Sequence, residues 1–197
     1  AVVDSRGQHI DIVDLWKGYF CITSNYSTAR EAVHTRGPLA KSIRASVSIP
    51  GALPPVMLDG ELHTDGGTFN NFPTDVMDRM GASRIIGVDL LRDRGQVYPL
   101  DEVPGALELM RDKLRGRARK YKLPSLTSLL LNTSMMNSYA RQQESQSLVD
   151  LYFAPGVNRF GLLDWSRFDQ IVEAGYRHGM ERLDQLGDAA IAPFRHA

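Results

Sequence analysis

The sequence contains almost no cysteine, no excess of one charge and no long apolar run. Cys21 is the only cysteine in 197 residues, which excludes an internal disulfide framework and favours a reducing compartment or a cysteine-poor periplasmic one. Lys plus Arg and Asp plus Glu both number 23, so overall charge favours neither nucleic acid nor an anionic membrane as partner. No apolar run approaches the roughly 18 residues of a membrane span. The histidines lack metal-ligand spacing, and we expect no metal.

The start of the chain is also missing familiar features. Residues 1–6 have neither the basic start nor the apolar stretch of a signal peptide, and the first residue is Ala1 rather than methionine. We therefore expect a fragment or a processed chain, in the cytoplasm or peripherally on a membrane. With 43% apolar residues and no repeat or linker, residues 1–197 should form one domain or one large part of a bigger domain.

The first half of the chain predicts short strands alternating with short helices. Strands are expected at 19–23, 56–58, 61–63 and 84–90, and helices at 39–45 and 74–80. Asp59-Gly60 is typical of a two-residue hairpin turn. Thr74 can cap the second helix, and Gly81 can end it. A strand, a helix and a further core strand at 84–90 predict α/β layering with parallel pairing.

The second half is predicted to be mainly helical. Apolar spacing indicates a helix over 103–114 and a second one from Ser125 to about 144, followed by a strand within 148–154. A last helix should begin at Asp164 or Ser166 and end at Gly187. The apolar residues of the second helix are expected to pack in the core: Leu126, Leu129, Leu130, Met136 and Tyr139.

One short segment carries a potential catalytic group. Residues 62–67 read Leu-His-Thr-Asp-Gly-Gly, so Asp65 ends a predicted strand beside two glycines that permit close backbone approach. Asp-Gly-Gly alone is typical of turns, in which the aspartate binds its own backbone. Asp65 by itself is a base without a nucleophile.

The surrounding motifs give this segment a context. In chain order they are Arg44-Ala45-Ser46, Ser48-Ile49-Pro50-Gly51, Leu53-Pro54-Pro55-Val56, Asp59-Gly60, Asp65-Gly66-Gly67, Asn70-Asn71-x-Pro73, Gly81-Ala82 and Val88-Asp89. This series resembles the second half of the patatin-like phospholipases. Earlier motifs resemble the neuropathy-target-esterase-like branch of that family: Asp14-Leu15-Trp16, Tyr19-Phe20-Cys21, Thr23-x-Asn25 and Val33-His34-x-x-Gly37.

The resemblance implies an α/β fold and a specific chemistry. The fold would be the patatin-like three-layer arrangement with a central, mostly parallel sheet, here incomplete at its N-terminal side. The activity would be that of a serine esterase or lipase acting on phospholipids or lysophospholipids, with a Ser–Asp dyad and no cofactor. Asp65 matches the family's catalytic aspartate. The site would be shaped by Gly66, Gly67, Ser46, Pro50, Gly51 and Asn70.

The sequence departs from the family at the nucleophile. The family's serine lies in a Gly-x-Ser-x-Gly turn between a strand and a helix, preceded by a glycine-rich loop. Only Gly175 and Gly179 have this spacing, and Arg177 stands between them. We therefore expect the nucleophile and the N-terminal part of the domain to lie outside this chain, and the chain alone to be inactive.

Several alternatives remain open. Ser46 or Ser48 could replace the missing serine, although neither has the glycines of a strained turn. His63 should face the same side as Asp65, but a solvated or edge histidine is expected rather than a triad member. Cys21 should be an inert buried thiol, and Asp89 a structural residue at a strand end. The chain could also be a non-catalytic patatin-like scaffold that binds lipid or a partner protein, or a plain α/β fold in which Asp65 shapes a turn.

One charged run stands out. Its basic residues are Arg111, Lys113, Arg115, Arg117, Arg119, Lys120 and Lys122. Such a run is usually a solvated helix end or loop, and contact with anionic lipid headgroups is the second interpretation. Nucleic acid is disfavoured because Tyr121 is the only stacking aromatic within the run.

Overall fold

A computed structural model describes residues 10–90, 105, 111, 126–157, 160–161 and 164–194. Its larger sheet has four strands in the order β2-β1-β4-β3. The strands are β1 (Cys21–Asn25), β2 (Arg30–His34), β3 (Val56–Leu58) and β4 (Glu61–Asp65). Each pair in this sheet is antiparallel. A smaller sheet joins β5 (Ile86–Val88) and β6 (Leu151–Phe153), which run parallel.

The predicted α/β class is confirmed, but the described strands differ from it in one respect. Parallel pairing is confined to β5 and β6, and the larger sheet is antiparallel rather than mostly parallel. The reason is the length of the connections, since residues 26–29 and 59–60 are too few for a parallel crossover. Asp59 and Gly60 have φ of 49° and 84°, as the twist-matched two-residue hairpin turn requires, so this predicted hairpin is confirmed.

Helix α1 (Leu39–Ser46) packs its Ala45 against Val56 and Leu58 of β3 in a small buried cluster. The turn η2 (Gly66–Thr68) and helix α2 (Thr74–Arg79) follow β4 directly. The predicted capping role of Thr74 is wrong, because Pro73 occupies the cap and the Thr74 hydroxyl donates to the carbonyl of Ser145 at 2.6 Å. Gly81 has φ of 83° just beyond the helix, as predicted for its end.

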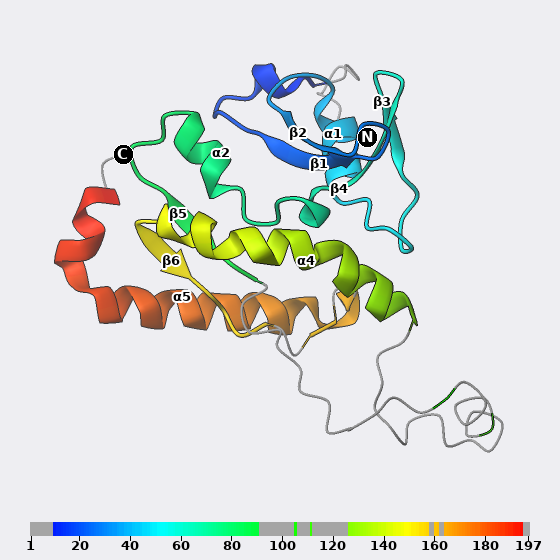
Figure 1. The fold of residues 1–197 in the computed structure, drawn as a ribbon. Coiled ribbons are helices and arrows are strands. Elements are labelled where there is room, and N and C mark those ends of the chain that lie inside the picture. The colour runs from blue at the N-terminus through cyan, green and yellow to red at the C-terminus, as the bar shows by residue number, and fades with distance from the viewer. Residues whose placement is uncertain are drawn as a thin grey trace.

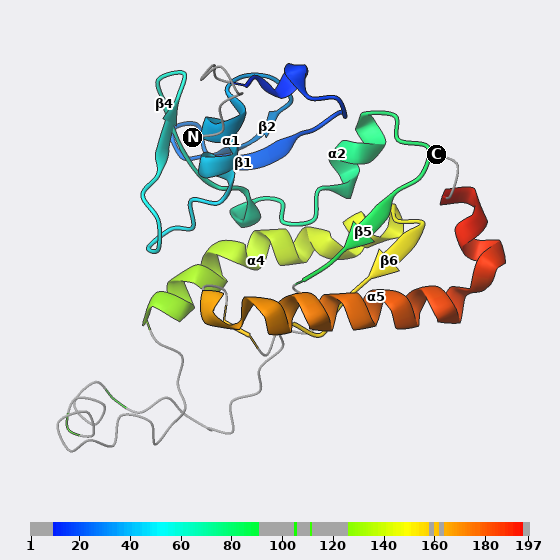
Figure 2. The ribbon, with the colours of Figure 1, turned by 180° about the vertical axis from the view of Figure 1, so that it is seen from behind.

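Two long helices complete the described part. Helix α4 (Leu126–Ser147) lies between the four-stranded sheet and helix α5 (Phe168–Ile191), with β5 and β6 beside the C-terminal half of α4 (Figures 1 and 2). Short 3-10 turns are η1 (Ile12–Asp14), η3 (Trp165–Arg167) and η4 (Ala192–Phe194). Gly187 breaks α5 with φ of 71°, where the sequence predicted the end of the helix. The helix predicted over 103–114 lies outside the described residues.

Two predictions about the core are wrong. Strand β5 is buried on one side only. Gly87 lies against the side chains of Phe72 and Val149, whereas Ile86 and Val88, on the opposite side, are 55% and 56% exposed. The apolar residues of α4 that the structure describes also lie mostly outward: Leu129, Leu130 and Met136 are exposed by 48%, 64% and 63%. The face of α4 that points inward is polar instead, with Ser138 and Ser145 buried.

Candidate active site

Asp65 is the last residue of β4 and caps the turn that follows. Its backbone is fixed on both sides: its N–H donates to the Ser48 carbonyl at 3.0 Å, and its carbonyl accepts from the Ser24 hydroxyl at 2.7 Å. Its side chain forms the cap, because Oδ1 accepts the Gly67 N–H at 2.7 Å. Among the described residues no donor is within hydrogen-bonding distance of Oδ2. One carboxylate oxygen is therefore held by the protein, and the other is left for a further partner.

Burial tunes the acidity of this group. The Asp65 side chain is only partly accessible to water, and this desolvation raises its pKa, whereas the hydrogen bond from the Gly67 amide acts in the opposite direction. A raised pKa makes the carboxylate a better proton acceptor than an exposed aspartate. Asp65 is thus suited to accept a proton from a neighbouring hydroxyl group.

The two glycines after Asp65 are required for different reasons. A Cβ on Gly66 would lie 2.6 Å from the Ile22 carbonyl carbon and still nearer its oxygen, so β1 can approach only glycine here. A Cβ on Gly67 would lie 2.8 Å from Oδ1 of Asp65 and 3.4 Å from the methyl group of Met135. Gly66 therefore permits close packing of the backbone, and Gly67 leaves space beside the carboxylate.

The residues predicted to shape the site are only partly brought together. The Ser48 carbonyl contacts Asp65, but its own hydroxyl is buried and donates to the Arg44 carbonyl at 2.6 Å. Such a hydroxyl is not available as a nucleophile. Ser46 ends α1 and is partly exposed, and Pro50 and Gly51 lie on an exposed loop. No hydrogen bond in the described structure links these three residues to Asp65.

His63 belongs to a buried cluster, so the expectation of a solvated or edge histidine is wrong. It is 3% exposed, and its Nδ1 lies 2.8 Å from Oγ1 of Thr23, which is also 2.7 Å from Nε2 of His34. The two imidazole rings meet edge to face at 5.5 Å. Desolvation is the main reason that the pKa of each histidine is lowered. The cluster stabilises the sheet, and none of these side-chain hydrogen bonds reaches the Asp65 carboxylate.

Two other residues behave as the sequence predicted. Cys21 is 8% exposed, and burial raises the pKa of its thiol, as expected of an inert cysteine. Asp89 is 2% exposed at the end of β5, where it accepts hydrogen bonds from Gln142 and from Tyr152, the latter at 2.6 Å. This carboxylate ties β5 to α4 and β6, which is a structural role.

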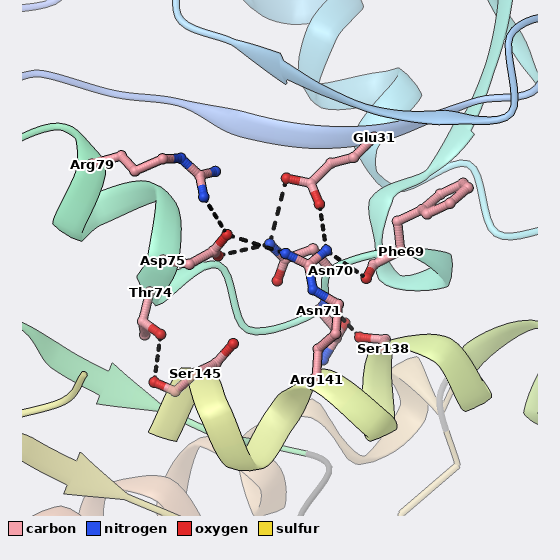
Figure 3. A network of polar contacts seen from close by, with 10 residues as sticks. All are labelled: Glu31, Phe69, Asn70, Asn71, Thr74, Asp75, Arg79, Ser138, Arg141 and Ser145. Atoms are coloured by element: carbon pink, nitrogen blue, oxygen red, sulfur yellow. Dashed lines mark hydrogen bonds and ion pairs between the residues drawn. The ribbon is translucent and has the colours of Figure 1, made fainter. Parts of the chain in front are cut away.

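Sequence reasoning missed the residues of α4 that hold the turn after Asp65. Figure 3 shows Asn70, a predicted site residue, beside Arg141 of α4 and the carboxylates of Glu31 and Asp75. The side chain of Asn70 is buried and donates to Asp75 at 2.9 Å. Only tertiary folding brings Arg141 here, because 66 positions separate it from Asp75. Its one signal in the sequence is charge, because Arg141 and Glu144 are the only charged residues of α4.

Neither a metal centre nor a membrane span is found in the part of the chain that the structure describes. Within those residues no three His, Cys, Asp or Glu side chains are grouped as metal ligands. None of the described helices is both long enough and apolar enough to cross a membrane. Most of the basic run at 111–122 lies outside the described residues.

These features define a class: an α/β protein with an aspartate at a strand end, followed by two glycines that sit in close contact with their neighbours. Residues 12–78 match the family described as "Patatin-like phospholipase". The chain belongs to the patatin-like phospholipase family, and its relatives place it in the neuropathy-target-esterase-like branch.

The relatives are larger proteins. Over 187 residues the chain is 31% identical to "Lysophospholipase NTE1" of Pyricularia oryzae, covering 92% of this chain and 12% of that protein. It is 33% identical over 178 residues to "Patatin-like phospholipase domain-containing protein 7" of Rattus norvegicus, covering 88% of this chain and 13% of the relative. It is also 33% identical over 178 residues to "Patatin-like phospholipase domain-containing protein 6" of Homo sapiens, covering 87% of this chain and 13% of the relative. The chain thus spans only 12–13% of the length of these relatives.

Proposed function

We propose that residues 1–197 are the C-terminal part of a single patatin-like hydrolase domain, and that the intact domain is a serine esterase of the phospholipase or lysophospholipase type. Asp65 is the base of a Ser–Asp dyad, and the nucleophilic serine belongs to polypeptide outside this chain. One observation carries the proposal. The partly buried Asp65 carboxylate has one oxygen bound to the Gly67 amide and the other without a described partner.

The proposed reaction proceeds through an acyl-enzyme. Asp65 takes the hydroxyl proton as the serine oxygen attacks the ester carbonyl, and the resulting acid returns this proton to the leaving alcohol. Water then gives a proton to Asp65, attacks the acyl-serine, and releases the fatty acid while the serine regains its proton. The role of Gly67 is to fix the carboxylate so that its second oxygen is oriented toward the serine.

The surface of the described part supports a contribution from further polypeptide. A pair of parallel strands is usually covered on both faces within a larger sheet. Here the outward side of β5 exposes Ile86 and Val88. Helix α5 buries none of its residues and exposes Phe168, Val172 and Tyr176 at four-residue spacing. These surfaces are suited to packing against further elements of the same domain.

Exchange of Asp65 for asparagine, in a polypeptide that includes the upstream residues, tests the proposal. Hydrolysis of lysophosphatidylcholine and of a short-chain nitrophenyl ester should fall by at least about 100-fold, because the base is lost while the Gly67 hydrogen bond is retained. Labelling of a serine by a fluorophosphonate should fall in parallel. Asp169→Asn on the exposed face of α5 is the matched control. Unchanged turnover in Asp65→Asn would contradict the proposal.

A non-catalytic scaffold is the second candidate. It is favoured by the lack of any Gly-x-Ser-x-Gly in these 197 residues. A scaffold should keep its binding to lysophospholipid micelles when Asp65→Asn is introduced into the polypeptide that includes the upstream residues. No serine of that polypeptide should react with the fluorophosphonate. Serine labelling that depends on Asp65 would exclude the scaffold.

The proposal also includes a peripheral membrane contact through the basic residues of 111–122. Lys120→Gln with Lys122→Gln should weaken binding to vesicles containing phosphatidylserine by roughly 10- to 30-fold, at about 1 kcal/mol for each charge. Arg177→Gln with Arg182→Gln removes the same charge from α5 and should have little effect. Equal losses from the two pairs, or binding that does not depend on salt, would contradict this contact.

A further inference from the structure

Helix α4 presents a polar stripe to the segment that follows Asp65. Ser138, Arg141 and Ser145 are three and four positions apart, so they share one face of the helix. The Ser138 hydroxyl accepts the Asn71 N–H at 2.7 Å, and the Ser145 carbonyl accepts from the hydroxyl of Thr74 at 2.6 Å (Figure 3). Helix α4 is therefore joined to the segment 69–75 by directed hydrogen bonds rather than by apolar packing alone.

Arg141 is the central connection of this stripe. Its Nη1 donates to Glu31 at 2.8 Å and to the Phe69 carbonyl at 3.4 Å, and its Nη2 donates to Asp75 at 3.2 Å. One guanidinium thus joins β2, the residue that ends η2, and α2. Lysine could not reproduce this arrangement, because it lacks the planar set of donors.

Asn70 reaches the same two carboxylates from the turn itself. Its amide donates to Asp75 at 2.9 Å and to Glu31 at 3.5 Å. Its backbone N–H donates to the Gly66 carbonyl at 2.9 Å, and the Phe69 N–H donates to that carbonyl at 3.0 Å. Phe69, whose carbonyl Arg141 contacts, and its neighbour Asn70 are therefore both hydrogen-bonded directly to Gly66, the first residue after Asp65.

The charges of the cluster are balanced and partly removed from water. Side chains of Glu31 and Asp75 are 17% and 18% exposed. Burial acts to raise the pKa of Asp75, but the hydrogen bonds from Asn70 and Arg79 and the charges of Arg79 and Arg141 outweigh it and lower the pKa. The hydrogen bond to Glu31 is the main reason that the pKa of Arg141 is raised. Asp75 and Arg141 therefore carry opposite charges at neutral pH, and removing Arg141 leaves the side chains of Glu31 and Asp75 close together without it.

We propose that Arg141 is a positioning residue for Asp65. By holding Phe69 and Asn70 against Glu31 and Asp75, it fixes the turn whose Gly67 amide orients the Asp65 carboxylate. This inference rests on the proposed function, in which Asp65 is the base. A base must lie within hydrogen-bond reach of the proton that it takes, and a displacement of about 1 Å from a distant change can cost roughly 100-fold in rate.

The test compares variants of the polypeptide that includes the upstream residues, in steady-state hydrolysis of a short-chain nitrophenyl ester. Arg141→Gln should lower kcat by about 10- to 100-fold and change KM by less than about threefold. Arg141→Lys should recover part of kcat, because it restores the charge without the fork of donors. Fluorophosphonate labelling of the serine should slow in proportion to kcat.

Two controls separate positioning from general loss of structure. Ile12→Val removes a buried methylene from η1, far along the chain from the cluster, and should cost about 0.5–1.5 kcal/mol of stability with kcat unchanged. Arg177→Gln breaks an exposed ion pair with Glu173 on α5 and should leave kcat unchanged. If Arg141→Gln does not fold, Glu31→Gln removes one carboxylate of the cluster and should lower kcat in the same way.

The outcomes are distinguishable. A normal kcat in Asp65→Asn would overturn the proposed function and this inference with it. An inactive Asp65→Asn together with a kcat within about twofold of normal in Arg141→Gln would overturn this inference alone. A loss of kcat in Ile12→Val as large as that in Arg141→Gln would also overturn it, because general destabilisation would then explain both.

Discussion

Replacement of Gly66 by alanine should be among the most damaging single-methyl changes in this chain. The added Cβ would lie 2.6 Å from the carbonyl carbon and 2.9 Å from the Cβ of Ile22, and nearer still to the carbonyl oxygen. These atoms belong to the backbone and the inner part of a buried strand, so no flexible side-chain end can move away. Gly66 does not have a positive φ, and its substitution therefore tests space alone.

The expected cost can be bounded. Forcing an extra carbon into a packed site costs about 1–3 kcal/mol. Alanine also restricts the unfolded chain more than glycine does, and this offsets the cost by roughly 0.4–1 kcal/mol. For a chain of this size each kcal/mol shifts the unfolding midpoint by about 2–4 °C. We expect Gly66→Ala to lower the midpoint by several degrees and, because the turn after Asp65 must move, to lower ester hydrolysis by more than its stability loss explains.

Thermal unfolding followed by circular dichroism measures the first effect. Gly175→Ala is the matched control, because a Cβ there meets nothing within 4 Å and the site is inside α5. That change should stabilise the helix by up to about 1 kcal/mol. A midpoint for Gly66→Ala equal to or above that of the unchanged protein would refute the close approach of β1 to this turn.

Three further predictions concern the buried histidines and the kink of α5. Thr23→Val should lower the free energy of unfolding by about 1–3 kcal/mol in urea titrations, because both imidazoles lose their hydroxyl partner; an unchanged midpoint would contradict the cluster. Burial lowers the pKa of His34 and His63, so the unfolded chain binds more protons, and stability should be full above about pH 6.5 and decrease as the pH falls. The measurement is the urea midpoint between about pH 7 and about pH 5. If the midpoint falls with pH in the parent but stays constant in a His34→Gln, His63→Gln double variant, the pH dependence of stability comes from these two rings. Gly187→Ala should cost about 1–3 kcal/mol, since its φ of 71° and ψ of 167° belong to a region open only to glycine, and a stabilised variant would argue for a continuous helix.

Local signals were sufficient for much of the first half of the chain. The hairpin at Asp59-Gly60, the extent of α1, the end of α2 at Gly81 and the break at Gly187 were all predicted, although α5 resumes after Gly187 and ends at Ile191. Each of these features depends on neighbouring residues and on the conformations open to glycine. The family was also evident from the motifs around Asp65. A carboxylate at the end of a strand beside two glycines can be recognised without knowing what surrounds it.

Tertiary structure decided what these elements meet. The burial of β5 and α4 was predicted wrongly, because apolar spacing shows which residues share a face but not whether anything covers that face. The inward face of α4 is polar, since its Ser138 and Arg141 side chains satisfy the backbone N–H of Asn71 and the carbonyl of Phe69 in the segment after Asp65. The pairing of Arg141 with Glu31 depends on chain folding across 110 positions. Sequence alone determined the chemistry that Asp65 can offer, and the fold determined how firmly that side chain is held.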